Sequence, residues 1–200
     1  MNGLKLAFLP AMTIALIVTG VAFTVTPVSD AHAQAEAAVN IRPPCTPQPD
    51  PTQLVIGRNC RNVVVDGFVR EFLVYVPDDL TTGDPVPIVF AYHYGTGAME
   101  LFSGTSGWRA IGRREDFIVV FPQALQYYSI DEGVWTARWN TFALQQRPDL
   151  ARLPGYPKTS PWPADDVAFT LAMIELLQSQ WTINDRRIYA AGFSNMILPH

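Results

Sequence analysis

An apolar run leads directly into a glycine and a serine: Ile188-Tyr189-Ala190-Ala191-Gly192-Phe193-Ser194-Asn195. The last four residues match the start of the pattern G-x-S-x-G, in which a sharp turn after a strand lifts a serine hydroxyl above a sheet. Such a turn makes Ser194 a candidate nucleophile, with the backbone N–H of Asn195 as a donor to an oxyanion. The alternative is an ordinary turn at a strand end, in which Ser194 has no chemical role.

Two earlier segments, residues 88–92 and 117–121, are nearly continuous apolar runs. Runs of this kind are typical of strands buried on both faces of a parallel sheet. A helix is expected between them, ending near Arg113-Arg114. A second helix is expected over residues 164–181, where apolar residues recur at helical spacing: Val167, Leu171, Ile174 and Leu177. The alternation of strands and helices predicts an α/β fold with parallel central strands.

An antiparallel hairpin is expected before the parallel strands. The fold is predicted to begin at Val63, where two β-branched and aromatic runs flank Asp66-Gly67. Asp-Gly favours a two-residue turn, because both of its central residues need positive φ. Alternating side chains of residues 68–76 are expected to face opposite sides of the sheet.

The loop after residues 88–92 is the second candidate for chemistry, and it reads His93-Tyr94-Gly95-Thr96-Gly97. Glycines let the main chain approach a developing negative charge, so its N–H groups would complete an oxyanion hole. We expect His93, Tyr94 and Gly95 to form this oxyanion loop, with His93 a structural residue rather than a catalytic base. The alternative is that Gly95 and Gly97 only shape a turn.

Residues 122–162 form a segment too long for a simple connection, and it is rich in aromatic residues and proline. Segments of this length are usually functional or disordered, and the aromatic content argues against disorder. One interpretation places Trp135 and Trp139 in a wall that faces the substrate. The other is that these aromatic residues only pack the segment onto the domain.

Residues 1–33 are expected to be a cleaved secretory signal. Lys5 precedes an uncharged apolar run, and Ala31-His32-Ala33 matches an A-x-A cleavage site. The alternative is a membrane anchor, because an uncharged run of this length could also span a bilayer. Cleavage would make the protein secreted or periplasmic, with no stable membrane association.

Residues 34–62 are predicted to be a proline-rich arm before a domain at 63–200. Both cysteines, Cys45 and Cys60, lie in this arm, and an oxidising compartment would let them form a disulfide. The alternative is two unpaired thiols. The formal net charge is −4 and the sequence has no basic block, so nothing in it indicates binding to nucleic acid. No Cys/His spacing indicates a metal site.

The motifs together resemble the secreted polyhydroxybutyrate depolymerase and feruloyl-esterase-like branch of the α/β-hydrolases. The resemblance covers about residues 63–195 and rests on Val74-Tyr75-Val76-Pro77, the His93 loop, Trp108 to Phe121-Pro122-Gln123, Asp165-Asp166-Val167-Ala168-Phe169 and Arg187 to Asn195. It implies a serine carboxylic-ester hydrolase with Ser194 as nucleophile and no metal or organic cofactor. Its substrates would be polyester, feruloyl or acetylated-carbohydrate esters. The implied fold is the N-terminal part of an α/β-hydrolase sheet, with the C-terminal strands missing.

The sequence departs from the family pattern in the loop and after the serine. Tyr94 stands between His93 and Gly95, where the family has glycine, so a displaced oxyanion loop is expected. Met196 occupies a small-residue position, and Pro199 would interrupt the helix that should follow. The family's acid and histidine come later in the chain than the serine. We therefore expect a truncated or frameshifted product, with little or no esterase activity from these residues alone.

Two other interpretations stay open. One is a non-catalytic secreted protein that binds polysaccharide or polyester through its aromatic segment. The other is a membrane-anchored variant that keeps residues 1–33.

Overall fold

The computed structural model describes residues 53–194 except 81–82, 142–143, 145–149 and 152–163. The elements in chain order are β1 (Gly57–Val65), β2 (Phe68–Val76), β3 (Val86–Tyr92), α2 (Met99–Thr105), α3 (Trp108–Arg114), β4 (Ile118–Pro122), β5 (Leu125–Ser129), β6 (Val134–Arg138), β7 (Leu150–Ala151), α5 (Asp166–Gln180) and β8 (Ile183–Gly192). They form a five-stranded sheet in the order β1-β2-β4-β3-β8 and a three-stranded sheet in the order β6-β5-β7.

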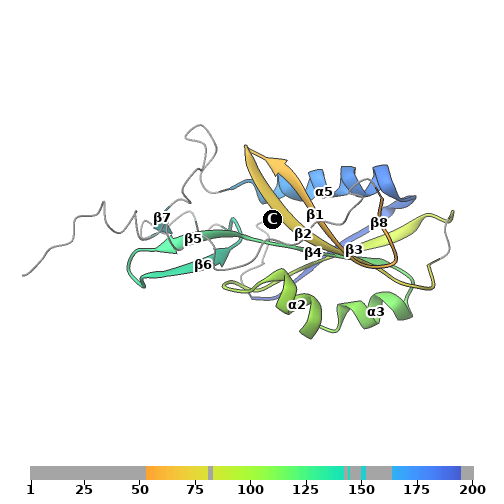
Figure 1. Ribbon diagram of the computed structural model, residues 1–200, viewed down its shortest axis with the longest axis horizontal. Coiled ribbons are helices and arrows are strands. Elements are labelled where there is room, and N and C mark those ends of the chain that lie inside the picture. Colours follow the sequence, from red (N-terminus) through yellow and green to blue (C-terminus); the bar gives the residue numbers. More distant parts are fainter. Residues whose placement is uncertain (1–52, 81–82, 142–143, 145–149, 152–163, 195–200) are drawn as a thin grey trace, which may run out of the picture.

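The five-stranded sheet lies between two layers of helices (Figure 1). On one face α5 buries Phe169, Met173 and Leu177 against sheet residues that include Phe72. On the other face α2 and α3 cover a second cluster that includes Leu73. Neighbouring residues of β2 thus enter opposite layers, as the two-residue period of a strand requires. The fold class is α/β, as predicted.

The expected hairpin is confirmed, but its first strand is longer than predicted. Val65 pairs with Phe68 across the turn, where Asp66 and Gly67 have φ of 54° and 79°. The prediction of a start at Val63 is wrong, because β1 already begins at Gly57. The polar residues of this stretch hide the strand in the sequence. One of them, Asn59, is buried because its side chain bonds to backbone groups of the chain before it.

The central strands are parallel and buried, as predicted. β3 pairs with both β4 and β8 in parallel, whereas β2 pairs with β4 antiparallel. Every residue of β3 and β4 is buried. β8 begins at Ile183, before the predicted apolar run, and it forms one edge of the sheet within the described residues.

The connection from β3 to β4 contains two short helices instead of the single predicted helix. Gly107 separates α2 from α3 with a left-handed φ of 79°, a backbone conformation that ends one helix and admits the next. The predicted end near Arg113-Arg114 agrees with the last residue of α3.

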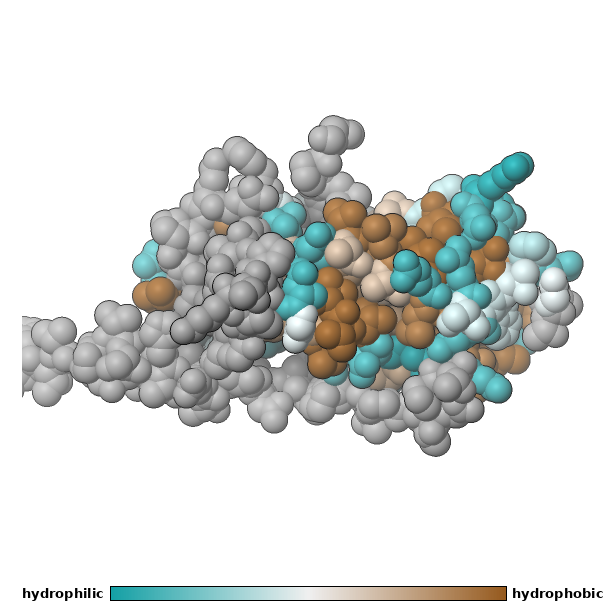
Figure 2. Space-filling model, turned by 90° about the horizontal axis from the view of Figure 1, so that it is seen from above, coloured by the Kyte–Doolittle hydropathy of each residue, from teal (hydrophilic) through white to brown (hydrophobic). Residues whose placement is uncertain are grey.

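The face of α5 that enters the core differs from the predicted one. Phe169, Met173 and Leu177 are buried, whereas Val167 and Leu171 are 63% and 56% exposed. Apolar residues lie on most sides of this helix, so spacing alone could not decide which side faces the sheet. Figure 2, seen from the α5 side, shows the apolar surface that results. The helix begins at Asp165, whose carboxylate accepts a hydrogen bond from the Ala168 N–H at 2.8 Å.

The long segment after β4 contains structure that the sequence did not reveal. β5 and β6 form an antiparallel hairpin, and β7 adds to β5. In Figure 1 this hairpin projects from the end of the main sheet.

Several predictions fall on residues outside the described part of the chain: the secretory signal at 1–33, most of the arm at 34–62, and Cys45. Cys60, in β1, is disulfide-bonded, but its pairing with Cys45 stays a prediction. Within the described residues, no helix has both the length and the apolar character needed to cross a membrane.

Candidate active site

The carboxyl ends of β3 and β8 lie side by side in the sheet. The register pairs Phe90 with Ala190 and Tyr92 with Gly192. Paired strands lie about 4.8 Å apart, so the loop after β3 and the turn after β8 leave the sheet next to each other. In open α/β sheets, ligands bind beyond the carboxyl ends of the strands. This place is therefore the candidate active site.

Ser194 stands two residues after β8 with a left-handed backbone, φ 62°. This conformation costs a residue other than glycine roughly 1–2 kcal/mol. Strain of this kind clusters at active sites, where the surrounding structure maintains it. The residue is also exposed. A strained turn directly after a strand is the backbone geometry that the G-x-S pattern predicts. Asn195, the predicted oxyanion donor, lies outside the described residues.

The loop after β3 folds back on itself and onto the β5–β6 hairpin. The Gly97 N–H donates to the Tyr94 carbonyl oxygen at 3.0 Å, and the Thr96 N–H donates to the Ala137 carbonyl oxygen at 2.8 Å. A Cβ on Gly97 would stand 2.8 Å from the Tyr94 oxygen, so the position has no room for a side chain. Among the described residues, no hydrogen bond engages the N–H of Tyr94 or Gly95. These two N–H groups are the loop's candidate oxyanion donors.

The side chain of His93 is fully buried and holds this loop in place. Its Nε2 accepts a hydrogen bond from the Ala124 N–H at 3.2 Å and lies 3.2 Å from the side-chain nitrogen of Gln123. The ring proton therefore sits on Nδ1, which donates to the Tyr94 carbonyl oxygen at 2.7 Å. Both ring nitrogens are engaged, which agrees with a structural histidine and leaves neither nitrogen to accept a proton from Ser194. His93 is the single histidine among the described residues.

Sequence reasoning assigned no role to Gln123, the residue that follows β4. Its side chain is buried and joins three segments. Oε1 accepts a hydrogen bond from the Met99 N–H at 2.9 Å, at the start of α2. Nε2 donates to the Ala124 carbonyl oxygen at 3.1 Å and faces His93. The available signal was an amide placed directly after an apolar strand, since buried amides need hydrogen-bond partners.

Trp139 lies beneath the loop, and its side chain is 1% exposed. Its Nε1–H donates to the His93 carbonyl oxygen at 2.7 Å, and its ring meets Tyr92 edge to face at 5.0 Å. The interpretation as a substrate-facing wall is therefore wrong for Trp139. Its contacts agree with the other interpretation, in which it packs the long segment onto the domain. Trp135 is half-buried in β6, edge to face with Tyr128 at 5.6 Å. A role for Trp135 in substrate binding stays a prediction.

An ion pair between the buried Arg70 and the partly buried Asp166 joins β2 to α5. Arg70 is 2% exposed, donates to Asp166 Oδ1 at 2.6 Å and lies 4.1 Å over the Phe169 ring. The other carboxylate oxygen of Asp166 accepts a hydrogen bond from the Asn140 N–H at 2.6 Å, next to Trp139. This pair could not be predicted from the sequence, because Arg70 and Asp166 lie far apart in the chain.

The hydroxyl of Tyr92 links β3 to α5. It lies 2.7 Å from Oγ1 of Thr170. Burial raises the pKa of Tyr92 to about 12, because the ionised phenolate would lose its solvation there. At neutral pH the group is therefore a neutral structural hydroxyl.

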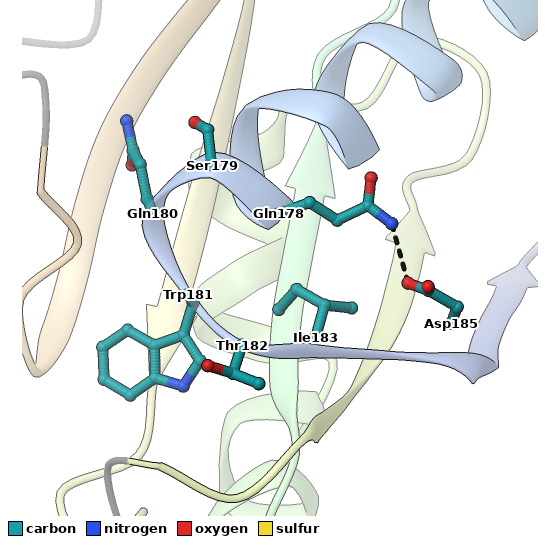
Figure 3. A pocket seen from close by; sticks show the side chains of 7 residues that line it. All are labelled: Gln178, Ser179, Gln180, Trp181, Thr182, Ile183 and Asp185. Atoms are coloured by element: carbon teal, nitrogen blue, oxygen red, sulfur yellow. Dashed lines mark hydrogen bonds between the residues drawn. The ribbon is translucent and has the colours of Figure 1, made fainter.

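A shallow pocket lies at the opposite end of β8, around the turn from α5 (Figure 3). It is lined by Gln178, Ser179, Gln180, Trp181, Thr182, Ile183 and Asp185. The strand between this pocket and Ser194 is about 30 Å long at the usual rise per residue, so the two are separate places. Within the described part of the chain, no group of three or more His, Cys, Asp or Glu side chains is placed to hold a metal ion.

Comparison with known proteins found no matching family model and no matching curated protein. Similar solved structures include an acetyl xylan esterase from Aspergillus awamori, with 19% identity over 67% of this chain and 42% of that chain and a TM-score of 0.45. The carboxylesterase EstE1 from a metagenomic library has 16% identity over 82% of this chain and 42% of that chain, with a TM-score of 0.41. An S-formylglutathione hydrolase from Agrobacterium tumefaciens has 16% identity over 71% of this chain and 51% of that chain, with a TM-score of 0.47.

The chain thus spans about half or less of the length of these three proteins. Their identities and TM-scores are low, whereas the strand order, the register and the turn at Ser194 define the fold directly.

Proposed function

We propose that this chain belongs to a carboxylic-ester hydrolase of the α/β-hydrolase type, with Ser194 as its nucleophile. The observation that carries the proposal is the left-handed backbone of Ser194 directly after β8, in register with the end of β3. A serine in this position presents its hydroxyl to a carbonyl bound above the sheet. The N–H groups of Tyr94 and Gly95 lie in the neighbouring loop, where an oxyanion hole is needed.

The proposed reaction proceeds in two halves. The Ser194 Oγ attacks the ester carbonyl carbon, its proton passes to a general base, and the carbonyl oxygen becomes an oxyanion. Collapse of this intermediate breaks the bond to the alcohol, which leaves with the proton, and an acyl-serine remains. Water then attacks the acyl carbon, the bond between that carbon and Oγ breaks, and the carboxylic acid leaves as the serine hydroxyl is restored. His93 is not this base, because both of its ring nitrogens are engaged in the loop.

The narrower assignment is to the polyhydroxybutyrate depolymerase and feruloyl-esterase-like branch. It is supported by the motifs that surround β3, β4, α5 and β8, and above all by Gly192-Phe193-Ser194-Asn195. The substrates proposed are polyester, feruloyl or acetylated-carbohydrate esters. Export is part of the same proposal, and it rests on the apolar run and the A-x-A site before residue 34. A Cys45–Cys60 disulfide would suit an exported protein.

The test compares two serine variants of the purified full gene product. Ser194→Ala should lower the turnover of a short-chain nitrophenyl ester by about 10⁴-fold or more, since the nucleophile is lost. Ser179→Ala is the matched control: it removes an exposed hydroxyl near the opposite end of β8 and should leave turnover unchanged. Equal turnover in Ser194→Ala and the wild type would overturn the proposal. If the protein instead binds a polysaccharide or polyester but hydrolyses no ester, a binding protein would be favoured.

A further inference from the structure

We infer that Gln123 is a positioning residue, whose carboxamide holds His93 in one tautomer and thereby fixes the backbone of the loop beside Ser194. The importance of this loop for catalysis rests on the proposed function. The hydrogen-bond network itself does not, so the two can be tested separately.

The first step is that the hydrogen bonds around Gln123 determine the orientation of its amide. Oε1 faces the Met99 N–H at 2.9 Å, which requires an acceptor. Nε2 faces the Ala124 carbonyl oxygen at 3.1 Å, which requires a donor. A carboxamide satisfies both groups at once, whereas a carboxylate or an apolar side chain of the same length does not.

The second step is that this orientation sets the imidazole of His93. The remaining amide hydrogen of Gln123 points to His93 Nε2 at 3.2 Å, and the Ala124 N–H donates to the same nitrogen. Two donors on Nε2 require that it carry no proton, so the proton of the neutral ring is on Nδ1. That proton is then available to the Tyr94 carbonyl oxygen at 2.7 Å.

The third step connects the imidazole to the loop backbone. The Tyr94 carbonyl oxygen that receives the Nδ1 proton also accepts the Gly97 N–H at 3.0 Å, so one acceptor closes the turn of the loop. When a carbonyl oxygen is fixed, so is the plane of the peptide that follows it. In this loop the following N–H is that of Gly95, one of the two candidate oxyanion donors. Gln123 thus acts on an oxyanion donor through His93 and Tyr94.

The burial of this network explains why the hydrogen bonds are strong enough to position the loop. His93 is fully buried and Gln123 is 7% exposed, so water does not compete for these groups. A buried network of this kind tends to specify one arrangement, because every unpaired member is costly. Trp139 completes it from below through its hydrogen bond to the His93 carbonyl oxygen.

The deciding experiment is nitrogen-15 NMR of the His93 imidazole at neutral pH. The signals of its ring nitrogens are assigned by their disappearance in His93→Asn. The wild type should show a protonated Nδ1 and an unprotonated Nε2. Gln123→Glu places a carboxylate oxygen, which can only accept hydrogen bonds, against both Nε2 and the Ala124 carbonyl oxygen. This variant should therefore lose the tautomer in which Nε2 carries no proton. Gln126→Met, a half-buried amide in β5, is the matched control and should leave the spectrum unchanged.

Gln123→Met serves as a second variant in case Gln123→Glu does not fold. It keeps the side-chain length but removes the partner of the Met99 N–H, whose hydrogen exchange should quicken by about tenfold or more, as loss of one hydrogen bond implies. The inference is overturned if wild-type His93 carries its proton on Nε2. It is equally overturned if the folded Gln123 variants keep the wild-type tautomer and the wild-type exchange rate.

Kinetics of the full gene product then separate positioning from substrate binding. In Gln123→Met we expect kcat for a nitrophenyl ester to fall, by up to about 10²-fold, with KM unchanged, because a displaced donor acts in the transition state. A rise in KM with unchanged kcat would contradict the positioning role. If the wild type shows no turnover, the proposed function fails, while the imidazole spectrum still decides whether Gln123 sets the tautomer.

Discussion

β3 and β8 are neighbours that run parallel and end in register, yet their surroundings differ. Every residue of β3 is buried. The loop that follows it is held by hydrogen bonds from the Ala124 N–H and the Trp139 side chain and by one that Thr96 donates to β6. Every residue of β8 is exposed or half-buried, and Ser194 follows it in a strained conformation. The loop with the candidate oxyanion donors is thus held by many contacts. The turn at Ser194 is held mainly through the pairing of β8 with β3.

Because the two strands are buried to different extents, mutations around them should differ in their effect on stability. Changes that loosen the β3 side should lower the stability of the whole domain, because they open its core. Changes at Ser194 should alter chemistry with little effect on stability. Four predictions test this division, in order of decreasing effect.

The largest effect is expected for Arg70→Met. It leaves the Asp166 carboxylate, 14% exposed, without its guanidinium partner, and breaking such a pair costs up to about 3–5 kcal/mol in the free energy of unfolding. Arg113→Met is the matched control, since its pair with Asp78 is more than half exposed, and solvent screening should leave its contribution to stability small. Urea unfolding measures both. Equal losses for the two variants would show that the Arg70 pair does not anchor the β3 side.

The second effect is expected for Gly97→Ala. The new Cβ would stand 2.8 Å from the Tyr94 oxygen and 2.9 Å from His93 Nδ1, so the loop must shift, at a cost of about 1–3 kcal/mol in stability. In Gly104→Ala the new methyl group meets open space on α2, and this variant should gain about 0.5–1 kcal/mol. Thermal or urea unfolding distinguishes the two. A neutral Gly97→Ala would contradict the tight packing of the loop.

The third effect is a dependence of stability on alkaline pH. The pKa of Tyr92 is raised from 10.0 to about 12 in the folded protein. A raised pKa contributes stability that is fully present below pH 10 and is lost as the pH rises towards 12. Between pH 8 and 11 the wild type should therefore lose about 1 kcal/mol more than Tyr92→Phe in urea unfolding. Parallel pH curves for the two proteins would mean that Tyr92 is not buried as described.

The smallest effect concerns the strained turn itself. Glycine accepts the left-handed φ of 62° without strain and alanine does not, so Ser194→Gly should be more stable than Ser194→Ala by about 1 kcal/mol. Both variants lack the hydroxyl, so the comparison isolates the backbone. Equal unfolding free energies would contradict a strained turn at Ser194.

The sequence predicted the parts of the fold that local patterns determine. The Asp66-Gly67 turn and the buried strands β3 and β4 were predictable, because turn chemistry and continuous apolar runs act locally. The buried face of α5 was not, because apolar residues lie on most of its sides and only contact with the sheet selects Phe169 over Val167. The start of β1 was hidden for a similar reason, since the burial of Asn59 depends on hydrogen bonds and not on side-chain polarity.

At the candidate site, the sequence indicated Ser194 and the loop, but not what holds the loop. The G-x-S pattern and the glycines after an apolar strand are local signals, and they gave positions for the serine and the backbone donors. The parts played by Gln123, Arg70 and Asp166 depend on contacts between segments distant in the chain. The sequence left open whether Trp139 faces a substrate or packs the segment, because exposure cannot be read from an aromatic residue in a long segment.

The most direct test of the central claim is to treat the full gene product with a fluorophosphonate and locate the adduct by mass spectrometry. Attack by a nucleophilic serine forms an Oγ–P bond and releases fluoride, which marks the residue permanently. We expect one adduct on the peptide that contains Ser194, and no adduct there in Ser194→Ala. An active ester hydrolase whose adduct lies on a different residue would contradict it.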